Sequence, residues 1–334
     1  MGRPTVSVIG AGVAGLASAI ELSARGFAVE VLERTATLGE GACSWKAGGM
    51  LAPWCEAATT DEAVARLGAP SIGWWRRHFP GTGSNGSLVV APARDAADLT
   101  RFAQRTTRHE WIDGERLAAL EPELAGRFRR ALFFPDEAHL DPRKALAALA
   151  ATLAARGVPI RFGVEAAPAS ASSDLVVDCR GLAAREALPD LRGVRGEMLV
   201  VRTRDVTLSR PVRLLHPRLP LYIVPRGEGL FMVGATMIES EERRAVSVRS
   251  AVELLNAAYT LHPAFGEAEI VELAADLRPA FPDNLPQVRR SGRVLHANGL
   301  FRHGFLLSPW LAGELADAVL QEMKDEDLPE RRRA

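Results

Sequence analysis

The sequence has very few cysteines. Its 334 residues include only Cys43, Cys55 and Cys179, and none of these falls in a spacing with another cysteine or a histidine that is typical of zinc sites. An odd number of isolated cysteines also argues against a disulfide framework. We therefore expect no bound metal and a reducing, cytoplasmic setting.

An excess of charge of either sign is also missing. Lys and Arg together number 41, Asp and Glu together number 41, and the formal net charge is zero. This balance gives no electrostatic reason to expect a nucleic acid or an anionic membrane surface as a partner. No apolar run is long enough to span a membrane. The sequence offers no Ser/His/Asp set and no paired carboxylates, so hydrolytic chemistry is not supported.

What the sequence does contain is a glycine-rich turn near its N-terminus. The stretch from Val6 to Arg34 reads VSVIGAGVAGLASAIELSARGFAVEVLER. A short apolar run precedes the glycines, a helical pattern follows them, and a second apolar run ends at Glu33. This order predicts a βαβ unit that carries the G-x-G-x-x-G fingerprint of dinucleotide-binding proteins.

Nucleotide binding explains each residue of this fingerprint. Gly10 permits the tight turn, Gly12 lets a pyrophosphate approach the backbone, and Gly15 lets the helix pack close to the strand. The free N–H groups at the helix N-terminus would face the phosphates. Glu33, at the tip of the second strand, would accept hydrogen bonds from both ribose hydroxyls. An acid at this position favours FAD or NAD over NADP.

The remainder of the chain indicates a second, β-rich unit. A loop of small residues follows Glu33, and residues 193–278 alternate as in an antiparallel sheet. A final helix is predicted from Leu311 to Met323, after Pro309. We therefore expect a discontinuous nucleotide-binding domain formed by residues 1–80, 137–190 and 290–334. Residues 81–136 and 191–289 would form the substrate-binding domain.

Seven ordered motifs carry a resemblance to one family. They read VIGAGVAGL, AGGMLAP, FFPDEAHLDPRKAL, VRGEMLVVR, YIVPR with VGATM, ADLRPAFPDNLP, and LFRHGFLLSPWLAGELAD. Over nearly its whole length the chain resembles the glycine oxidase (ThiO) branch of the FAD-dependent D-amino-acid oxidase superfamily. The resemblance implies an α/β fold, in which an FAD-binding Rossmann-like domain of the GR2 type joins a β-rich antiparallel substrate domain.

The resemblance also implies a cofactor and an activity. It implies noncovalent FAD and the oxidative deamination of glycine, sarcosine and small D-amino acids, by hydride transfer from Cα to flavin N5. The products would be an imine and, with oxygen as the acceptor, hydrogen peroxide. The imine would supply thiamine thiazole synthesis, and a homo-oligomer is compatible with the family.

The same motifs assign roles to individual residues. By resemblance, Arg302 of LFRHG pairs with the substrate carboxylate, Tyr222 of YIVPR bonds the same group, and Arg278 of LRP is a second active-site arginine. Met237 and Met50 match apolar positions near the substrate and the flavin. The residues expected at the cofactor are Gly10, Gly12, Val13, Ala14, Gly15, Glu33, Arg34, Ser44, Gly48, Gly49, Met50, Val164, Gly181, His303, Gly304, Phe305 and Leu306.

Elementary chemistry supports such a site. A zwitterionic amino acid needs a fixed cation for its carboxylate, and the planar fork of an arginine binds and orients that group at once. A tyrosine hydroxyl adds a second donor. No side-chain base is required if the amine enters the site neutral.

The sequence departs from the family pattern in three places. Only nine residues separate positions 164 and 174, where the family normally has a longer β excursion. His303 stands where asparagine is common, and Trp54-Cys55 follows the AGGMLAP motif. Both are expected near the flavin or the substrate entrance. Trp54 and the two methionines predict a small pocket.

Three other interpretations stay open. The chain could be an amine or D-amino-acid dehydrogenase of the same fold that passes electrons to an acceptor other than oxygen. It could be an NAD-dependent enzyme, although the loops at residues 44–51 and 301–306 disfavour this. It could also be a noncatalytic flavin-binding partner in a complex.

Overall fold

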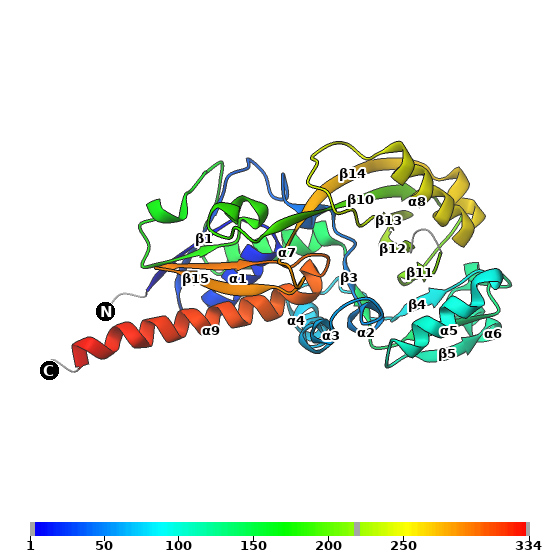
Figure 1. Ribbon diagram of the computed structural model, residues 1–334, viewed down its shortest axis with the longest axis horizontal. Coiled ribbons are helices and arrows are strands. Elements are labelled where there is room, and N and C mark those ends of the chain that lie inside the picture. Colours follow the sequence, from blue (N-terminus) through cyan, green and yellow to red (C-terminus); the bar gives the residue numbers. More distant parts are fainter. Residues whose placement is uncertain (1–3, 217–220, 332–334) are drawn as a thin grey trace.

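The computed structural model describes residues 4–216 and 221–331, with side chains as far as residue 323. Its strands form two large sheets that stand next to each other along the long axis of the molecule (Figure 1). A third, two-stranded sheet joins β3 (Met50–Leu51) to β7 (Ala138–His139).

The first sheet is mostly parallel and has six strands. Strand β1 pairs in parallel with β2 on one side and with β9 on the other, and only the edge strand β15 runs antiparallel to its neighbour. Buried parallel strands are typically short and mostly apolar. All of β9 and all of β1 except Thr5 are buried here. The strand order is β15 (Gln287–Ser291), β16 (Val294–Asn298), β9 (Leu175–Asp178), β1 (Thr5–Ile9), β2 (Ala28–Glu33) and β8 (Ile160–Phe162).

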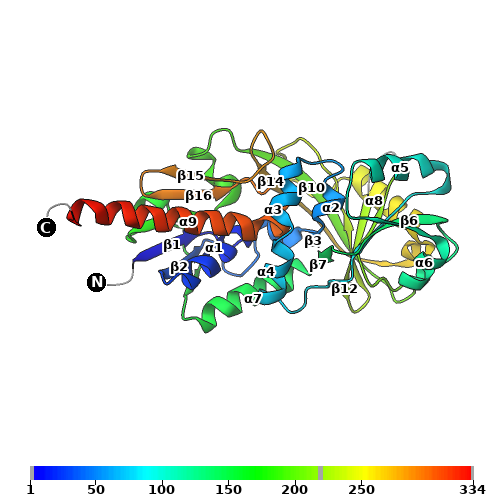
Figure 2. The ribbon, with the colours of Figure 1, turned by 90° about the horizontal axis from the view of Figure 1, so that it is seen from below.

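Three helices cover this sheet and enclose its core. Helix α1 (Val13–Ala24) packs against α7 (Pro142–Ala155) and α9 (Gly304–Arg331), and Figure 2 shows α9 running alongside α1. Leu16 and Ile20 of α1 are completely buried in the core. Asp141 caps α7: its carboxylate accepts a hydrogen bond from the Arg143 N–H at 2.9 Å.

Helix α9 begins earlier than the sequence predicts. Proline usually ends a helix because it lacks an N–H, so we expected the helix to follow Pro309. It starts instead at Gly304, and Pro309 lies inside its second turn. The carbonyl of Phe305 thereby loses its helical donor, and the indole N–H of Trp75 replaces it at 2.6 Å. Trp75 is completely buried.

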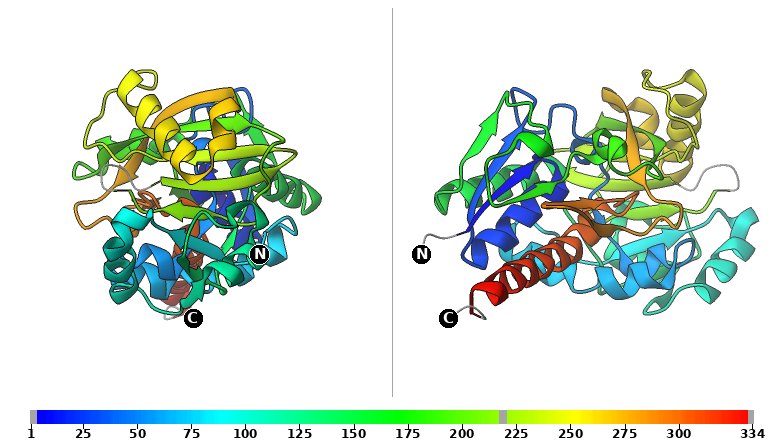
Figure 3. Two further views of the ribbon diagram at one scale, coloured as in Figure 1. Left: turned by 90° about the vertical axis from the view of Figure 1, so that its right-hand side faces the viewer. Right: turned by 60° about the vertical axis from the view of Figure 1, so that its left-hand side comes forward.

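The second sheet has eight strands and is mostly antiparallel. Its two longest strands, β14 and β10, pair along almost their whole length, and helix α8 (Val248–Leu261) lies across one face (Figure 3). A hairpin turn at residues 226–229 joins β12 to β13. The order is β14 (Glu269–Ala280), β10 (Arg192–Arg202), β13 (Leu230–Gly234), β12 (Leu221–Gly227), β11 (Val212–Leu214), β4 (Ser87–Val90), β6 (Arg130–Phe134) and β5 (Glu110–Asp113).

Short helices complete the chain. They are α2 (Pro53–Glu56), α3 (Glu62–Gly68), α4 (Ser71–His78), α5 (Ala96–Gln104) and α6 (Gly114–Leu120). The parallel and antiparallel sheets confirm the predicted fold class. The strands of the first large sheet lie in the predicted nucleotide-binding segments, and those of the second lie in the predicted substrate-binding segments. The exception is β15, which begins at Gln287, before the predicted boundary at residue 290. The domain boundaries stay a prediction. Within the described ranges no helix is long and apolar enough to cross a membrane.

Candidate active site

A cavity of about 1480 Å³ lies between the two sheets. One end is formed by the carboxyl ends of β1 and β2 and by the start of α1. The other end is formed by residues of β10, β12, β13 and β14. Of the site residues predicted from the sequence, all except Gly15 line this cavity. The carboxyl ends of parallel strands are the usual ligand-binding edge of such sheets.

The glycine turn after β1 has the predicted geometry. Gly10 has a φ of +103°, and a Cβ there would lie 2.8 Å from the carbonyl oxygen of Cys179. A Cβ on Gly15 would lie 1.8 Å from the carbonyl oxygen of Gly10, so this glycine serves helix packing. Gly12 is different: its φ is −73°, and a Cβ would meet nothing closer than Ser44 Oγ at 3.6 Å. The fold itself does not require a glycine at this position.

The open space at Gly12 fits a ligand that approaches the backbone. Helix α1 begins at Val13, whose N–H donates to Ser44 Oγ at 3.3 Å, and this helix N-terminus lies at the cavity. Exposed N–H groups and the helix dipole suit the phosphates of a dinucleotide. The residues present at this end of the cavity therefore fit the pyrophosphate of FAD.

Glu33 lies at the tip of β2 and is held by the backbone. Its carboxylate accepts hydrogen bonds from the N–H of Ala11 at 2.7 Å and from the N–H of Thr35 at 3.0 Å. Its Oε1 also accepts from the hydroxyl of Thr35 at 2.9 Å. Because each carboxylate oxygen accepts about two hydrogen bonds, Oε2 retains acceptor capacity for a ribose hydroxyl. Opposite this tip, Val164 also lines the cavity, and its N–H donates to the carbonyl of Glu33 at 2.9 Å.

Arg278 and Tyr222 lie at the other end of the cavity. Arg278 donates to the carbonyl of Thr236 at 3.1 Å, and within residues 4–216 and 221–323 no carboxylate forms an ion pair with it. Burial lowers the pKa of Arg278, but an arginine still stays charged at neutral pH. Two glycines make room here: a Cβ on Gly48 would lie 2.7 Å from the Tyr222 ring, and one on Gly196 would lie 2.1 Å from Arg278 Nη2.

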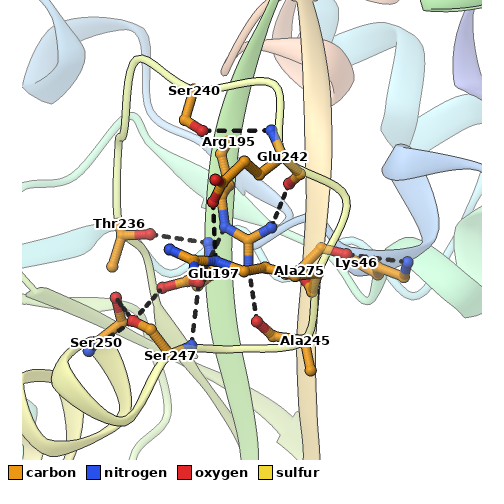
Figure 4. Close-up of polar contacts among 11 residues, drawn as sticks. Lys46, Arg195, Glu197, Thr236, Ser240, Glu242, Ala245, Ser247, Ser250 and Ala275 are labelled. Atoms are coloured by element: carbon orange, nitrogen blue, oxygen red, sulfur yellow. Dashed lines mark hydrogen bonds and ion pairs between the residues drawn. The ribbon is translucent and has the colours of Figure 1, made fainter.

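A buried network fixes the loop that carries Thr236 (Figure 4). Arg195 and Glu197 of β10 form an ion pair at 2.6 Å, with side chains 3% and 1% exposed. Arg195 also donates to the carbonyls of three residues between 242 and 245. The N–H of Glu197 donates to Thr236 Oγ1 at 2.9 Å. Because Thr236 accepts from Arg278, this network holds the arginine in place.

Arg302 lies in the same cavity but already has a partner. Its Nη2 is 2.7 Å from Oε2 of Glu56, while the second oxygen of Glu56 accepts from Arg213. Burial would raise the pKa of Glu56, but the charges of Arg302 and Arg213 outweigh it and lower the pKa to about 2. The role of Arg302 at the substrate carboxylate stays a prediction. Of Arg213, Arg278 and Arg302, only Arg278 forms no ion pair with a carboxylate among the residues whose side chains are described.

Local motifs do not predict Glu56 and Arg213 as site residues. Glu56 ends the short helix α2, and Arg213 lies on β11, where it pairs directly opposite Tyr222. The two side chains are 157 positions apart in the sequence and meet only in the folded chain. The one available signal is that Glu56 follows the AGGMLAP motif by three residues.

The sequence departures have different outcomes. His303 is buried at the cavity as expected, and burial lowers its pKa to about 4, so it is neutral at pH 7. The expectation that Trp54 narrows the pocket is wrong. Trp54 lines a separate small depression, where the guanidinium carbon of Arg108 lies 4.5 Å from its ring centroid. Met50 and Tyr222 pack against the same core cluster, and Met237 is 57% exposed at the cavity.

Comparisons with known proteins agree with this arrangement. The family model for FAD dependent oxidoreductases matches residues 5–318. The putative thiamine biosynthesis oxidoreductase ThiO of Rhizobium etli is 56% identical over 328 residues, which cover 98% of this chain and 99% of that protein. Glycine oxidase of Geobacillus kaustophilus is 29% identical, with 95% of this chain and 93% of that protein covered.

The structural comparison gives the same relationship. A crystal structure of glycine oxidase from Geobacillus kaustophilus has a TM-score of 0.77 and 25% sequence identity, and 95% of each chain is covered. The resemblance inferred from the seven motifs is therefore confirmed. The chain belongs to the FAD dependent oxidoreductase family, as an FAD-dependent enzyme related to ThiO and glycine oxidase.

Proposed function

We propose that the enzyme oxidises glycine and other small amines, such as sarcosine and small D-amino acids, to imines. Oxygen is the proposed acceptor, which gives hydrogen peroxide, and the imine is proposed to serve thiamine thiazole synthesis in the cytoplasm. The observation that carries the proposal is the half-buried guanidinium of Arg278, which lies in the cavity without a carboxylate partner among the residues whose side chains are described. The names of the ThiO and glycine oxidase relatives support it.

The protein's part in the reaction is to bind and orient the amine. Arg278 would hold the carboxylate through two parallel hydrogen bonds, and the hydroxyl of Tyr222 would donate a third. Clamping this group fixes the position of Cα in the cavity, which is the main contribution of such contacts to rate. FAD, when bound, supplies the hydride acceptor. Thr236 would keep Arg278 at the correct angle.

The proposed cofactor contacts follow the length of the cavity. Gly12 and the N-terminus of α1 would take the pyrophosphate, and Glu33 would take the ribose hydroxyls. The loop at residues 48–50 and the start of α9 would border the flavin ring. Gly304 is the first residue of α9, so its end of the helix also presents N–H groups to the cavity.

Anaerobic flavin reduction tests the proposal directly. We expect glycine and sarcosine to reduce the flavin faster than D-phenylalanine at equal concentration. Arg278→Ala should lower the efficiency with glycine by about 10- to 100-fold, because a charge-assisted pair contributes about 1.5–3 kcal/mol. A small amine without a carboxylate should be affected much less. Equal losses with both amines would contradict the role of Arg278.

Two further measurements separate the alternatives. Formation of hydrogen peroxide with air as the only oxidant supports oxygen as the acceptor. A flavin that is reduced by an amine but is not reoxidised by oxygen indicates a dehydrogenase. Normal FAD content without reduction by any amine would overturn the proposed activity and favour a noncatalytic flavin protein.

A further inference from the structure

Glu56 presents an unusual arrangement inside the cavity. The residue is only 7% exposed. Its carboxylate lies between two guanidinium groups, with Arg302 at one oxygen and Arg213 at the other. All three residues line the same cavity as Arg278 and Tyr222. An amino-acid carboxylate bound between two arginines would make the same contacts that Glu56 makes.

The charges around Glu56 do not cancel. Arg213, Arg278 and Arg302 supply three positive charges, and Glu56 is the ionised carboxylate that bonds to two of them. The nearby carboxyl of Glu137 adds no charge at pH 7, because burial raises its pKa to about 8. If the charge of Glu56 were removed, Arg213 and Arg302 would both lack a carboxylate partner among residues 4–216 and 221–323.

We propose that Glu56 is a specificity-determining residue that occupies the place of a second substrate carboxylate between Arg213 and Arg302. The side chain of Glu56 fills that position, and its negative charge repels another anion. Of these three arginines, Arg278 is then the anchor left for the substrate carboxylate, and the site selects amines that carry one carboxylate. This inference depends on the proposed amine oxidation and adds the reason for its selectivity.

A purely structural role is the competing explanation. The ion pair between Glu56 and Arg213 ties α2 to β11, two elements far apart in the sequence. In that case the loss of Glu56 would lower stability and would affect all substrates equally. The two explanations therefore differ in the ratio of efficiencies for substrates with one and two carboxylates.

Sarcosine and iminodiacetate form a suitable pair, because the second differs from the first by one added carboxylate. We expect Glu56→Gln to raise the ratio of iminodiacetate to sarcosine efficiency in anaerobic flavin reduction by about tenfold or more, because the variant no longer repels a second carboxylate and leaves the guanidinium of Arg302 free to pair with it. Binding gives an independent readout. Glutarate and butyrate are their unreactive analogues, and the ratio of their affinities, measured from changes in the flavin spectrum, should shift likewise.

Two variants complete the test. Glu137→Gln is the matched control: it replaces a neighbouring buried carboxyl that is neutral at pH 7, so both ratios should stay at the wild-type value. If Glu56→Gln does not fold, the double variant Glu56→Gln/Arg213→Gln removes one charge of each sign. This double variant still leaves Arg302 without its carboxylate partner, and we expect both ratios to rise by about threefold.

Specific outcomes would overturn the inference. Glu56→Gln, or the double variant in its place, with normal FAD content and unchanged ratios would show that Glu56 is only structural. The proposed function fails separately, if no amine reduces the flavin of the wild type. In that event the glutarate and butyrate affinities still decide whether Glu56 selects against a second carboxylate.

Discussion

At the scale of single residues, the substrate end depends on a glycine of the VRGEMLVVR motif for which the sequence alone predicts no role. A Cβ on Gly196 would lie 2.1 Å from Nη2 of Arg278. The clash involves the far end of a flexible side chain, so the fold can accept Gly196→Ala while the guanidinium must move. We expect normal FAD content and about a tenfold loss in glycine efficiency, which steady-state kinetics would measure. Wild-type efficiency in this variant would contradict the assigned position of Arg278.

Glu137 makes a prediction about pH at the same scale. Its pKa is about 8 in the folded protein, against an ordinary value of 4.5. The folded state therefore binds more protons than the unfolded state between these values, and this group lowers stability as pH rises through that window. The slope is at most about 1.4 kcal/mol per pH unit.

Glu137→Gln should remove this dependence. The difference between the free energies of unfolding of the variant and the wild type should increase in favour of the variant as pH rises from 5 to 8. Urea titrations of both proteins at each pH measure this difference. Ser87 and the N–H of Cys55 bond to Glu137, and a glutamine can keep one acceptor for them. Two parallel stability curves would show that Glu137 is ionised throughout.

At the scale of elements, helix α9 shows why a local rule fails. Pro309 predicts a helix that starts after it, and that rule is correct when nothing replaces the missing N–H. Here Trp75 donates to Phe305 from 230 positions away in the sequence, so the helix can begin at the cavity. A substitute donor at that separation leaves no local signal, whereas the Asp141–Pro142 start of α7 was predictable from adjacent residues.

Trp75→Phe tests the importance of this donor. The substitution keeps a buried ring but leaves the Phe305 carbonyl without a partner, and an unsatisfied buried group costs about 1–3 kcal/mol. Trp74→Phe is the control, because its indole N–H bonds to the part-exposed Glu21 and water can replace it. Urea denaturation should show the larger loss for Trp75→Phe. Equal losses would mean that Pro309 needs no substitute donor.

At the scale of the whole molecule, the two ends of the cavity differ in how predictable they are. The cofactor end is formed by residues close in sequence, from Gly10 to Glu33, so one motif identifies it. The substrate end brings together distant strands: Arg213 lies opposite Tyr222, and Arg278 lies against Gly196. Family motifs placed Tyr222 and Arg278 there. Glu56 and Arg213 were missed because their pairing depends on how the chain joins α2 to the second sheet.

A cavity that lies between the sheets links cofactor binding to the stability of the whole chain. A ligand that binds only the folded state stabilises it by about 2.7 kcal/mol at one hundred times its dissociation constant. We therefore expect added FAD to raise the melting temperature of the wild-type apoprotein, as measured by thermal denaturation at several FAD concentrations.

Gly12→Val should abolish this response without damaging the fold. The backbone at Gly12 has a φ that any residue adopts, and the first Cβ contact would be an ordinary 3.6 Å. The added side chain would instead fill the proposed path of the pyrophosphate. The apoprotein of the variant should match the wild-type apoprotein in circular dichroism and melting temperature, yet show no rise with FAD. Gly313→Ala in α9, where a Cβ meets nothing within 4 Å, is the control and should respond to FAD like the wild type. A variant at Gly12 that still gains stability from FAD would place the pyrophosphate elsewhere in the cavity.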